Sequence, residues 1–275
     1  MAFIVINGEL IPAESATVSP DDRGLVLGDG LFETIAVRDG EPRHLDLHLA
    51  RLERAREAFN LNRGIASDRI AELIEILLEK NELDDARVRV TLTRGRNRGS
   101  MSLYDAEPDT LITAIPLSPR REGGLALITA GIRFSPHNPI FFHKTLNRLP
   151  HLWARSEAER AGADEALILD ETGNVACAST ANLFAVSRGM LFTPPLTAPI
   201  LPGITRGRTL RLAAEAELIV RESCFAPIML AGADEVFLTN SIQGVMPVTS
   251  VDGRPVGSGQ PGPAAARLRK LLEED

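Results

Sequence analysis

The chain has 275 residues, of which 44% are hydrophobic and 24% charged, and its formal net charge is −7. This is the composition of a globular protein, its acidic balance does not favour nucleic acid as a partner, and no run approaches the roughly 20 apolar residues of a membrane span. The opening residues lack the basic start of a signal peptide, and the two cysteines, Cys177 and Cys224, exclude a disulfide framework or a zinc module, so we expect a cytoplasmic protein.

The first part of the chain predicts hairpins and then helices. Asn7-Gly8 and Asp39-Gly40 are turn signals between apolar runs. Apolar residues at helical spacing predict a helix over 45–59 and a second over 68–80. Two strands follow, in ARVRVTLTRG and DTLITAIPL. We place a smaller N-terminal domain at 1–116 and an interdomain linker at 117–124, where proline, glycine and charge occur together.

The larger C-terminal domain is expected at 125–275. It begins with the strand LALITAGIRF and the amphipathic helix LPHLWARSEAERAGA. A meander of three strands follows, its second strand containing NVACASTANLF, and a helix then runs from Gly203 to about Glu217. The end of the chain is strand-rich and closes with a short helix. Hairpins mixed with separated helices favour α+β domains over a doubly wound sheet.

Lysine is rare, so any reaction that needs an amine has few candidates. The chain has only Lys80, Lys144 and Lys270. Lys80 ends a predicted helix, and Lys270 lies on a predicted surface helix. Lys144 follows NPIFFH, whose apolar side chains could desolvate the amine, lower its pKa and suit it to Schiff-base chemistry. The alternative is a lysine at a strand end that simply reaches solvent.

Other segments could bind anions. LPGITRG is a glycine turn that leads into a helix, so the N–H groups of Ile204 and Thr205 could bind a phosphate. Arg51 could bind one bidentately, and the arginine-rich loop at 94–98 suits a carboxylate. Each feature also fits an ordinary helix start or charged surface. With the amine, and with a strand small enough at 174–184 to leave room for a flat ring, they indicate a pyridoxal-phosphate site.

Five blocks carry a family resemblance, in this order: GDGLFETIAV with HLARL, HKTLNRL, GADEALILDETGNV with ANLF, LPGITR, and DEVFLTNSIQGVMPV. The sequence resembles the class IV, or fold type IV, pyridoxal-phosphate enzymes. These include branched-chain and D-amino-acid aminotransferases and 4-amino-4-deoxychorismate lyase. The resemblance implies a two-domain α+β fold of the D-amino-acid aminotransferase type with the cofactor in the cleft. It also implies a homodimer in which the neighbour's loop helps to close the site.

The resemblance also implies roles for individual residues. Lys144 would form the Schiff base with pyridoxal 5′-phosphate and act as the catalytic residue. The remaining roles are phosphate binding by Arg51, Ile204, Thr205 and Ser241, ring contacts by Ser179 and Thr180 with the adjacent Asn182, and substrate contacts by Phe32, Thr34 and Arg98. Arg98 would bind a carboxylate, and Thr34 would relay a proton. No metal is expected.

One residue departs from the family pattern. Members of the family carry a glutamate five residues before the ANLF-type segment, where it pairs with the pyridine nitrogen, and here that position is Cys177. A neutral thiol is only a weak donor and cannot replace a carboxylate. We therefore expect Cys177 near the ring nitrogen, in a less electron-demanding reaction or in a site that has lost activity.

The substrate is predicted from smaller differences. Phe32 replaces a tyrosine of the D-amino-acid transaminases, and 147–149 lacks the tyrosine that branched-chain enzymes show after their lysine. KTLNRL and TNSIQGVMPV are most similar to the lyases. The first expectation is therefore 4-amino-4-deoxychorismate lyase, which releases pyruvate and 4-aminobenzoate for folate synthesis. A branched-chain or D-amino-acid aminotransferase is the second, and a catalytically weak cofactor-binding relative the third.

Overall fold

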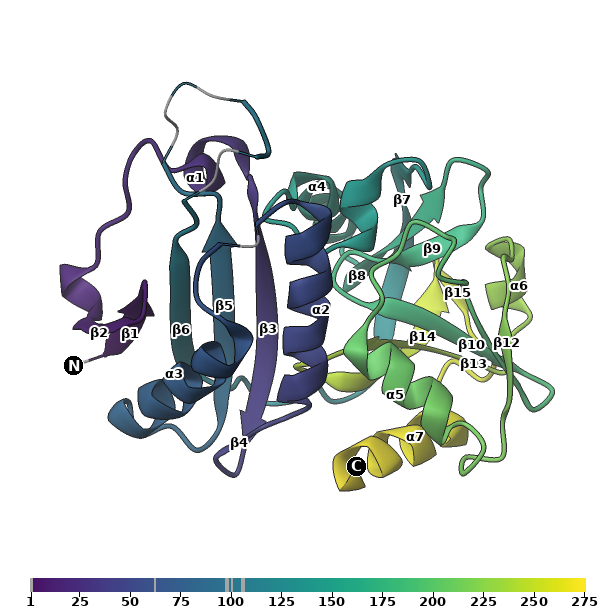
Figure 1. The fold of residues 1–275 in the computed structure, drawn as a ribbon. Coiled ribbons are helices and arrows are strands. Elements are labelled where there is room, and N and C mark those ends of the chain that lie inside the picture. Colours follow the sequence, from purple (N-terminus) through teal and green to yellow (C-terminus); the bar gives the residue numbers. More distant parts are fainter. Residues whose placement is uncertain (1, 62, 97–98, 100, 105–106) are drawn as a thin grey trace. The chain divides into compact units, whose positions relative to one another are not determined.

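The computed structural model describes residues 2–61, 63–96, 99, 101–104 and 107–275. The chain forms two compact units, one of residues 1–119 with 143–148 and the other of residues 120–142 with 149–275. Each unit has a sheet of its own (Figure 1). The predicted C-terminal domain was expected to carry Lys144, whereas the structure groups Lys144 with the first unit.

The first unit is built on an antiparallel sheet whose strand order is β2-β1-β6-β5-β3-β4. Helices α2 and α3 lie against this sheet, and their apolar side chains form one core with it (Figure 1). The strands are β1 (Phe3–Ile6), β2 (Glu9–Pro12), β3 (Gly30–Arg38), β4 (Glu41–Pro42), β5 (Ala86–Thr93) and β6 (Thr110–Pro116), and the helices are α1 (Arg23–Leu27), α2 (Leu45–Ala58) and α3 (Ser67–Lys80).

Local signals explain these elements. Asn7, Gly8, Asp39 and Gly40 all have positive φ, as the tight turns predicted from their sequence require. The helices predicted over 45–59 and 68–80 are confirmed as α2 and α3. In β3, alternate residues face the core, so Glu33 lies on the same buried face as its apolar neighbours two residues before and after it.

The segment 143–148 is bound to the start of β3. The Phe32 amide donates to the carbonyl of Lys144 over 2.9 Å, and the Leu146 amide donates to the carbonyl of Gly30 over 2.9 Å. The His143 ring meets the ring of Phe59 edge-on, with 5.1 Å between the centroids. These contacts place Lys144 beside β3 and explain why it belongs to the first unit.

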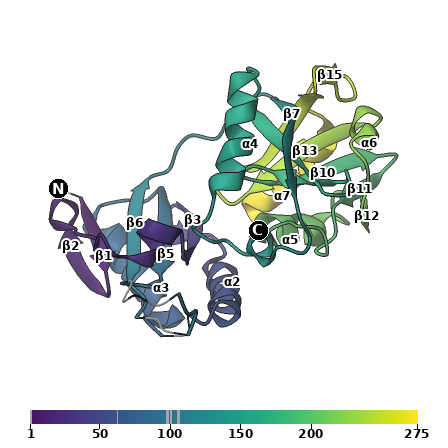
Figure 2. The same cartoon turned by 90° about the horizontal axis from the view of Figure 1, so that it is seen from above.

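The second unit contains a mixed sheet in the order β12-β11-β10-β13-β14-β7-β8-β9, with β15 paired to β14. Helix α4 packs on β7 and β8, and α5 and α7 pack on each other and on β13 (Figure 2). The strands are β7 (Leu125–Phe134), β8 (Glu165–Asp170), β9 (Val175–Ala178), β10 (Asn182–Ser187), β11 (Met190–Thr193), β12 (Ile219–Glu222), β13 (Glu235–Asn240), β14 (Gly244–Val251) and β15 (Arg254–Pro255). The helices are α4 (Leu149–Arg160), α5 (Ile204–Leu212), α6 (Ile228–Ala231) and α7 (Pro263–Glu274).

Two expectations for this unit were wrong. The predicted strand through NVACASTANLF is broken, because β9 ends at Ala178 and β10 begins at Asn182. The Ala178 amide donates to the carbonyl of Ala181 and closes a tight turn between the two strands. Helix α5 ends at Leu212, five residues before the expected end, and turns lead to Glu217, which has positive φ. Of the helices in the described part of the chain, none is both long and apolar enough to cross a membrane.

Candidate active site

The first unit gathers charged groups around the ring of Phe32. The Lys144 amine lies 4.4 Å from the centroid of this ring, and the guanidinium carbon of Arg89 lies 3.9 Å from the same centroid. Phe32 is buried, whereas Lys144 and Arg89 are half-buried. An aromatic face attracts cations. The ring therefore holds an amine and a guanidinium close together at the edge of the first unit's sheet.

A buried carboxylate, Glu33, links β3 to α2. Arg51 donates from Nε to Oε1 of Glu33 over 2.8 Å and from Nη2 to Oε2 over 2.7 Å. His48 contacts Oε2 through Nδ1 at 2.8 Å, and because a carboxylate only accepts, Nδ1 carries the proton. Glu33 and His48 are each 1% exposed and Arg51 is 7% exposed. The three side chains form one buried network.

The surroundings of Lys144 change its protonation. Burial, followed by the positive charge of Arg51, lowers the pKa of Lys144 from 10.5 to about 7, and Arg148 and Arg89 act in the same direction. Glu33 opposes this by favouring the charged amine. A lysine with a pKa near 7 is largely neutral at physiological pH. The Lys144 amine can therefore act as a nucleophile and as a general base.

The network keeps Glu33 ionised. Burial by itself would raise the pKa of Glu33, but the hydrogen bond from His48 and the charge and hydrogen bonds of Arg51 lower it to about 2. Burial lowers the pKa of His48, although Glu33 opposes the shift. The network thus contains a permanent carboxylate, a permanent guanidinium and an imidazole that favours its neutral form.

The other substrate-contact predictions in this unit have different outcomes. Thr34 lies on the same face of β3 as Phe32, two residues away, and is paired in register with Arg89. Arg98 lies outside the residues that the structure describes. Arg94 of the same loop is 1% exposed, and its guanidinium donates to Asp29 and to the carbonyls of Phe59 and Leu103. Arg94 is therefore a structural anchor.

Cys177 lies in the second unit, on β9. It is 6% exposed and belongs to an apolar cluster that includes Ala154 and Ala158 of α4. Phe134 and Phe141 stack in the same cluster, with 3.9 Å between their ring centroids. The small side chains of β9 thus allow close packing of a helix, which sequence reasoning had not considered.

Ser179 and Thr180 lie in the turn between β9 and β10 and share one partner. Both hydroxyls donate to the carboxylate of Glu165 at the start of β8, Ser179 to Oε1 and Thr180 to Oε2, the latter over 2.8 Å. Arg155 of α4 also donates to Oε2 of Glu165, over 3.2 Å. Since their protons point to Glu165, the Ser179 and Thr180 oxygens offer acceptor lone pairs to a ligand.

The start of α5 has the form of an anion site. Gly203 is the N-cap residue, and no side chain among the described residues caps this helix end. Asn182 holds the preceding loop by donating to the carbonyl of Leu201 over 3.0 Å. The amides of Ile204 and Thr205 form the first turn, where N–H groups point along the helix axis. Ser241 is half-buried in the turn between β13 and β14, which is stabilised by Asn240.

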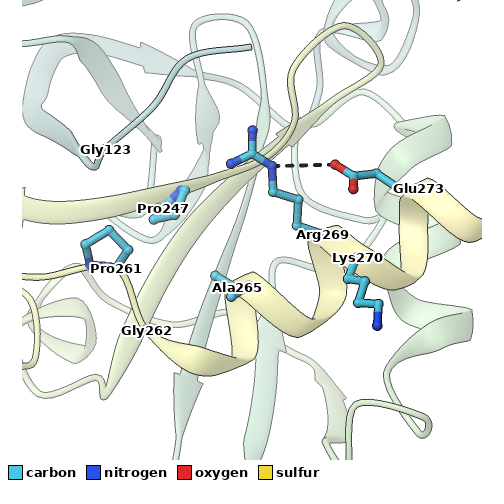
Figure 3. Close-up of a pocket in the computed structure, with 9 residues that line it drawn as sticks. Gly123, Pro247, Pro261, Gly262, Ala265, Arg269, Lys270 and Glu273 are labelled. Carbon is cyan, nitrogen blue, oxygen red and sulfur yellow. Dashed lines mark ion pairs between the residues drawn. The ribbon is translucent and has the colours of Figure 1, made fainter. Parts of the chain in front are cut away.

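A pocket elsewhere in the second unit holds none of the predicted site residues. It measures about 250 Å³ and is lined by residues that include Pro247, Pro261 and Ala265. Arg269 at its edge pairs with Glu273 over 3.9 Å, and Lys270 points in a different direction (Figure 3). The positive groups do not converge there, so this pocket is not the candidate site.

Each unit by itself carries groups that pyridoxal phosphate needs. The first unit offers a neutral lysine amine beside a buried arginine, and the second offers an uncapped helix start and acceptor oxygens. This donor chemistry fits an aldehyde, a phosphate and an aromatic ring.

Sequence reasoning missed Glu33, Arg89 and Glu165. Glu33 and Glu165 are carboxylates within buried strand faces, a pattern that could have identified them as partners of buried donors. Arg89 gave no such signal, because it occupies the half-exposed face of an alternating strand.

Comparison with known proteins identifies the family. The model of the class IV amino-transferases matches residues 30–251. A protein of Methanocaldococcus jannaschii that carries the name of a branched-chain-amino-acid aminotransferase is 34% identical, over 98% of this chain and 95% of its own length. The D-alanine aminotransferase of Bacillus licheniformis is 30% identical, over 98% of this chain and 95% of its own length.

Solved structures agree with this result. The Escherichia coli branched-chain amino acid aminotransferase has a TM-score of 0.93 and 31% identity, covering 99% of this chain and 94% of its own. The T.th. branched-chain enzyme with pyridoxamine 5′-phosphate gives 0.92 and 29%, covering 99% and 93%. A Legionella pneumophila structure, named as a 4-amino-4-deoxychorismate lyase, gives 0.89 and 28%, covering 95% and 96%.

These matches confirm the predicted fold type and pyridoxal 5′-phosphate as the cofactor. The chain therefore belongs to the class IV aminotransferase family of pyridoxal-phosphate enzymes, which act as aminotransferases or lyases.

Proposed function

We propose that the protein is an aminotransferase that moves an amino group between an amino acid and a 2-oxo acid, and that its preferred substrates have branched apolar side chains. The observation that carries the proposal is the match, over nearly the whole chain, to proteins named as aminotransferases. The branched-chain preference is supported by the Escherichia coli structure and by Phe32, which replaces the tyrosine of D-amino-acid enzymes. This reverses the order expected from sequence motifs, in which the lyase came first.

Lys144 is the group that would perform the chemistry. Pyridoxal phosphate, when bound, supplies an electron-accepting ring that stabilises negative charge at the substrate's Cα. With a pKa of about 7, the Lys144 amine can take the Cα proton as a general base and return a proton afterwards as the ammonium ion. Phe32 holds the amine against its face, which limits the positions that the amine can reach.

Positive side chains in the first unit would bind the anionic groups. Arg51 would hold the cofactor phosphate, and Arg89, stacked on Phe32, would attract the carboxylate of the substrate. Arg98 and Thr34 stay predictions as substrate contacts. In the second unit, Ile204, Thr205 and Ser241 stay predicted phosphate ligands, and Cys177, Ser179 and Thr180 stay predicted ring contacts.

The lyase is a second candidate, because the Legionella pneumophila structure covers nearly the whole chain. In that reaction too, Lys144 would take the Cα proton, but pyruvate would leave and 4-aminobenzoate would remain.

One experiment tests the proposal. Purified protein is loaded with pyridoxal phosphate and incubated with L- and D-amino acids paired with branched-chain 2-oxo acids or 2-oxoglutarate, and separately with aminodeoxychorismate. Formation of the new amino acid supports the aminotransferase. Release of 4-aminobenzoate and pyruvate without amino transfer would replace it with the lyase.

A control on the cofactor makes a negative result informative. Borohydride reduction followed by peptide mass spectrometry should find the cofactor attached to Lys144. Attachment to Lys144 without turnover of any substrate would indicate a catalytically weak relative. No attachment, with pyridoxal phosphate in excess, would overturn the catalytic role of Lys144.

We further propose that the enzyme is a homodimer. Leu149, Leu152 and Trp153 on α4 are 69%, 61% and 55% exposed, and they lie at the three- and four-residue spacing that puts side chains on one helix face. An exposed apolar face of this kind marks an interaction surface. Light scattering should find a dimer, and Trp153→Glu should shift it toward monomer. A monomeric wild type would contradict this proposal.

A further inference from the structure

We propose that Glu33 is a positioning residue for the cofactor, which acts by fixing the guanidinium of Arg51 in the orientation that binds the phosphate. This inference rests on the proposed role of Arg51. Glu33 itself would touch neither cofactor nor substrate.

The geometry of the pair fixes the guanidinium. The two contacts, Nε to Oε1 at 2.8 Å and Nη2 to Oε2 at 2.7 Å, are nearly equal and use both carboxylate oxygens. Because a guanidinium is planar and rigid, two such bonds determine both its plane and the edge that it presents away from Glu33. Without Glu33, the long Arg51 side chain would sample several rotamers.

Glu33 is itself held in place. Its backbone belongs to the centre of β3, which pairs with β5 over its whole length. His48, one helical turn before Arg51 on α2, donates to Oε2 over 2.8 Å. The carboxylate is therefore fixed by a strand on one side and by a second donor on the other, and it can serve as a rigid reference for Arg51.

The cost of this arrangement argues for a function. Glu33 occupies a face of β3 whose neighbours Leu31 and Ile35 are 1% and 0% exposed. A buried ion pair often stabilises a protein no more than apolar side chains of the same volume would. This pair stands beside Lys144, where Arg51 and Glu33 act on the amine with opposite signs. Its place beside the reactive amine favours a role in organising the site over a role in stability.

The experiment compares two ligands that differ only in the phosphate. Cofactor-free wild type, Glu33→Gln, Arg51→Gln and the double variant are titrated with pyridoxal phosphate and with pyridoxal, and binding is followed by absorbance. Glu33→Gln should weaken pyridoxal phosphate by about 10- to 100-fold, as expected for the loss of one or two charged contacts, and pyridoxal by less than about threefold. The double variant should bind pyridoxal phosphate no more weakly than Arg51→Gln.

Glu53→Gln is the matched control. Glu53 pairs with the buried Arg56 on the same helix, over 2.9 Å, and this pair has no contact with the Glu33 network in the described structure. The control should leave the affinities for both ligands unchanged. If Glu33→Gln fails to fold in a thermal unfolding test, Glu33→Asp, which keeps the charge but shortens the side chain, replaces it with the same expected selectivity.

Two outcomes would overturn the inference. Equal weakening of both ligands by Glu33→Gln would reveal a general structural role, and additive losses in the double variant would show that Glu33 does not act through Arg51. The test needs no turnover, so it separates from the proposed function. A phosphate-selective loss in a protein without amino transfer would leave the inference standing, whereas an unchanged selectivity in an active aminotransferase would overturn it alone.

Discussion

The amine of Lys144 should titrate near pH 7 in the cofactor-free protein, far below the ordinary lysine value of 10.5. At pH 7.5 a group with a pKa of about 7 is roughly three-quarters neutral, whereas an ordinary lysine is neutral in about one molecule in a thousand. The difference in the population of reactive amine is therefore several-hundredfold. This difference would allow Lys144 to react with an aldehyde without a separate base.

Competitive labelling with acetic anhydride measures this directly. Cofactor-free protein is labelled at a series of pH values from 5 to 11, and the peptide that contains Lys144 is quantified by mass spectrometry. Lys270, whose side chain is 75% exposed, reports the chemistry of a solvated amine in the same sample. A midpoint for Lys144 within about one unit of pH 7 supports the argument, and a midpoint above about 9.5 would refute it.

Two variants test the cause of the shift. Arg51 lowers the pKa of Lys144 and Glu33 raises it. Arg51→Gln should therefore raise the labelling midpoint, and Glu33→Gln should lower it. Movement of both midpoints in the same direction would show that charge does not control the amine.

The same shift predicts how stability depends on pH. The folded state disfavours the charged amine, so the penalty is fully present below about pH 7 and disappears as the pH rises toward 10.5. Relative to Lys144→Met, which is neutral at every pH, the cofactor-free wild type should gain stability across this window. Urea unfolding of both proteins at pH 7 and pH 9 measures the difference, and a constant difference would contradict the prediction.

Three further substitutions have defined outcomes. Cys177→Glu puts a carboxylate into an apolar cluster, so thermal unfolding should detect a loss of about 2–4 kcal/mol without cofactor and a smaller loss with it; equal losses would separate Cys177 from the ring nitrogen. Glu165→Gln removes the charged acceptor of Ser179 and should lower the free energy of unfolding by about 1–3 kcal/mol, measured in urea, whereas no change would mean that the turn holds itself. Gly203→Ala would bring a Cβ within 2.1 Å of Oδ1 of Asn182, so the loop must move and binding of pyridoxal phosphate, followed by absorbance, should weaken; unchanged affinity would exclude this turn from the phosphate site.

The sequence by itself determined the local structure and the choice of lysine. The Asn7-Gly8 and Asp39-Gly40 turns, and helices α2 and α3, lie where their patterns predict, because turn geometry and helical spacing depend on residues close together in the chain. Lys144 was singled out by the apolar residues before it, and its pKa of about 7 agrees with the desolvation that they suggested.

The tertiary structure decided which groups act together. Leu31 meets Thr145 across more than a hundred residues of sequence, which is why Lys144 lies beside β3. Periodicity indicated that Arg51 lies on a helix face but gave no sign that Glu33 would hold it, and the break at Ser179 depends on Glu165 from another strand. A local pattern determines the face on which a side chain lies, whereas its partner depends on how distant segments pack, and the chemistry of this protein depends on those partners.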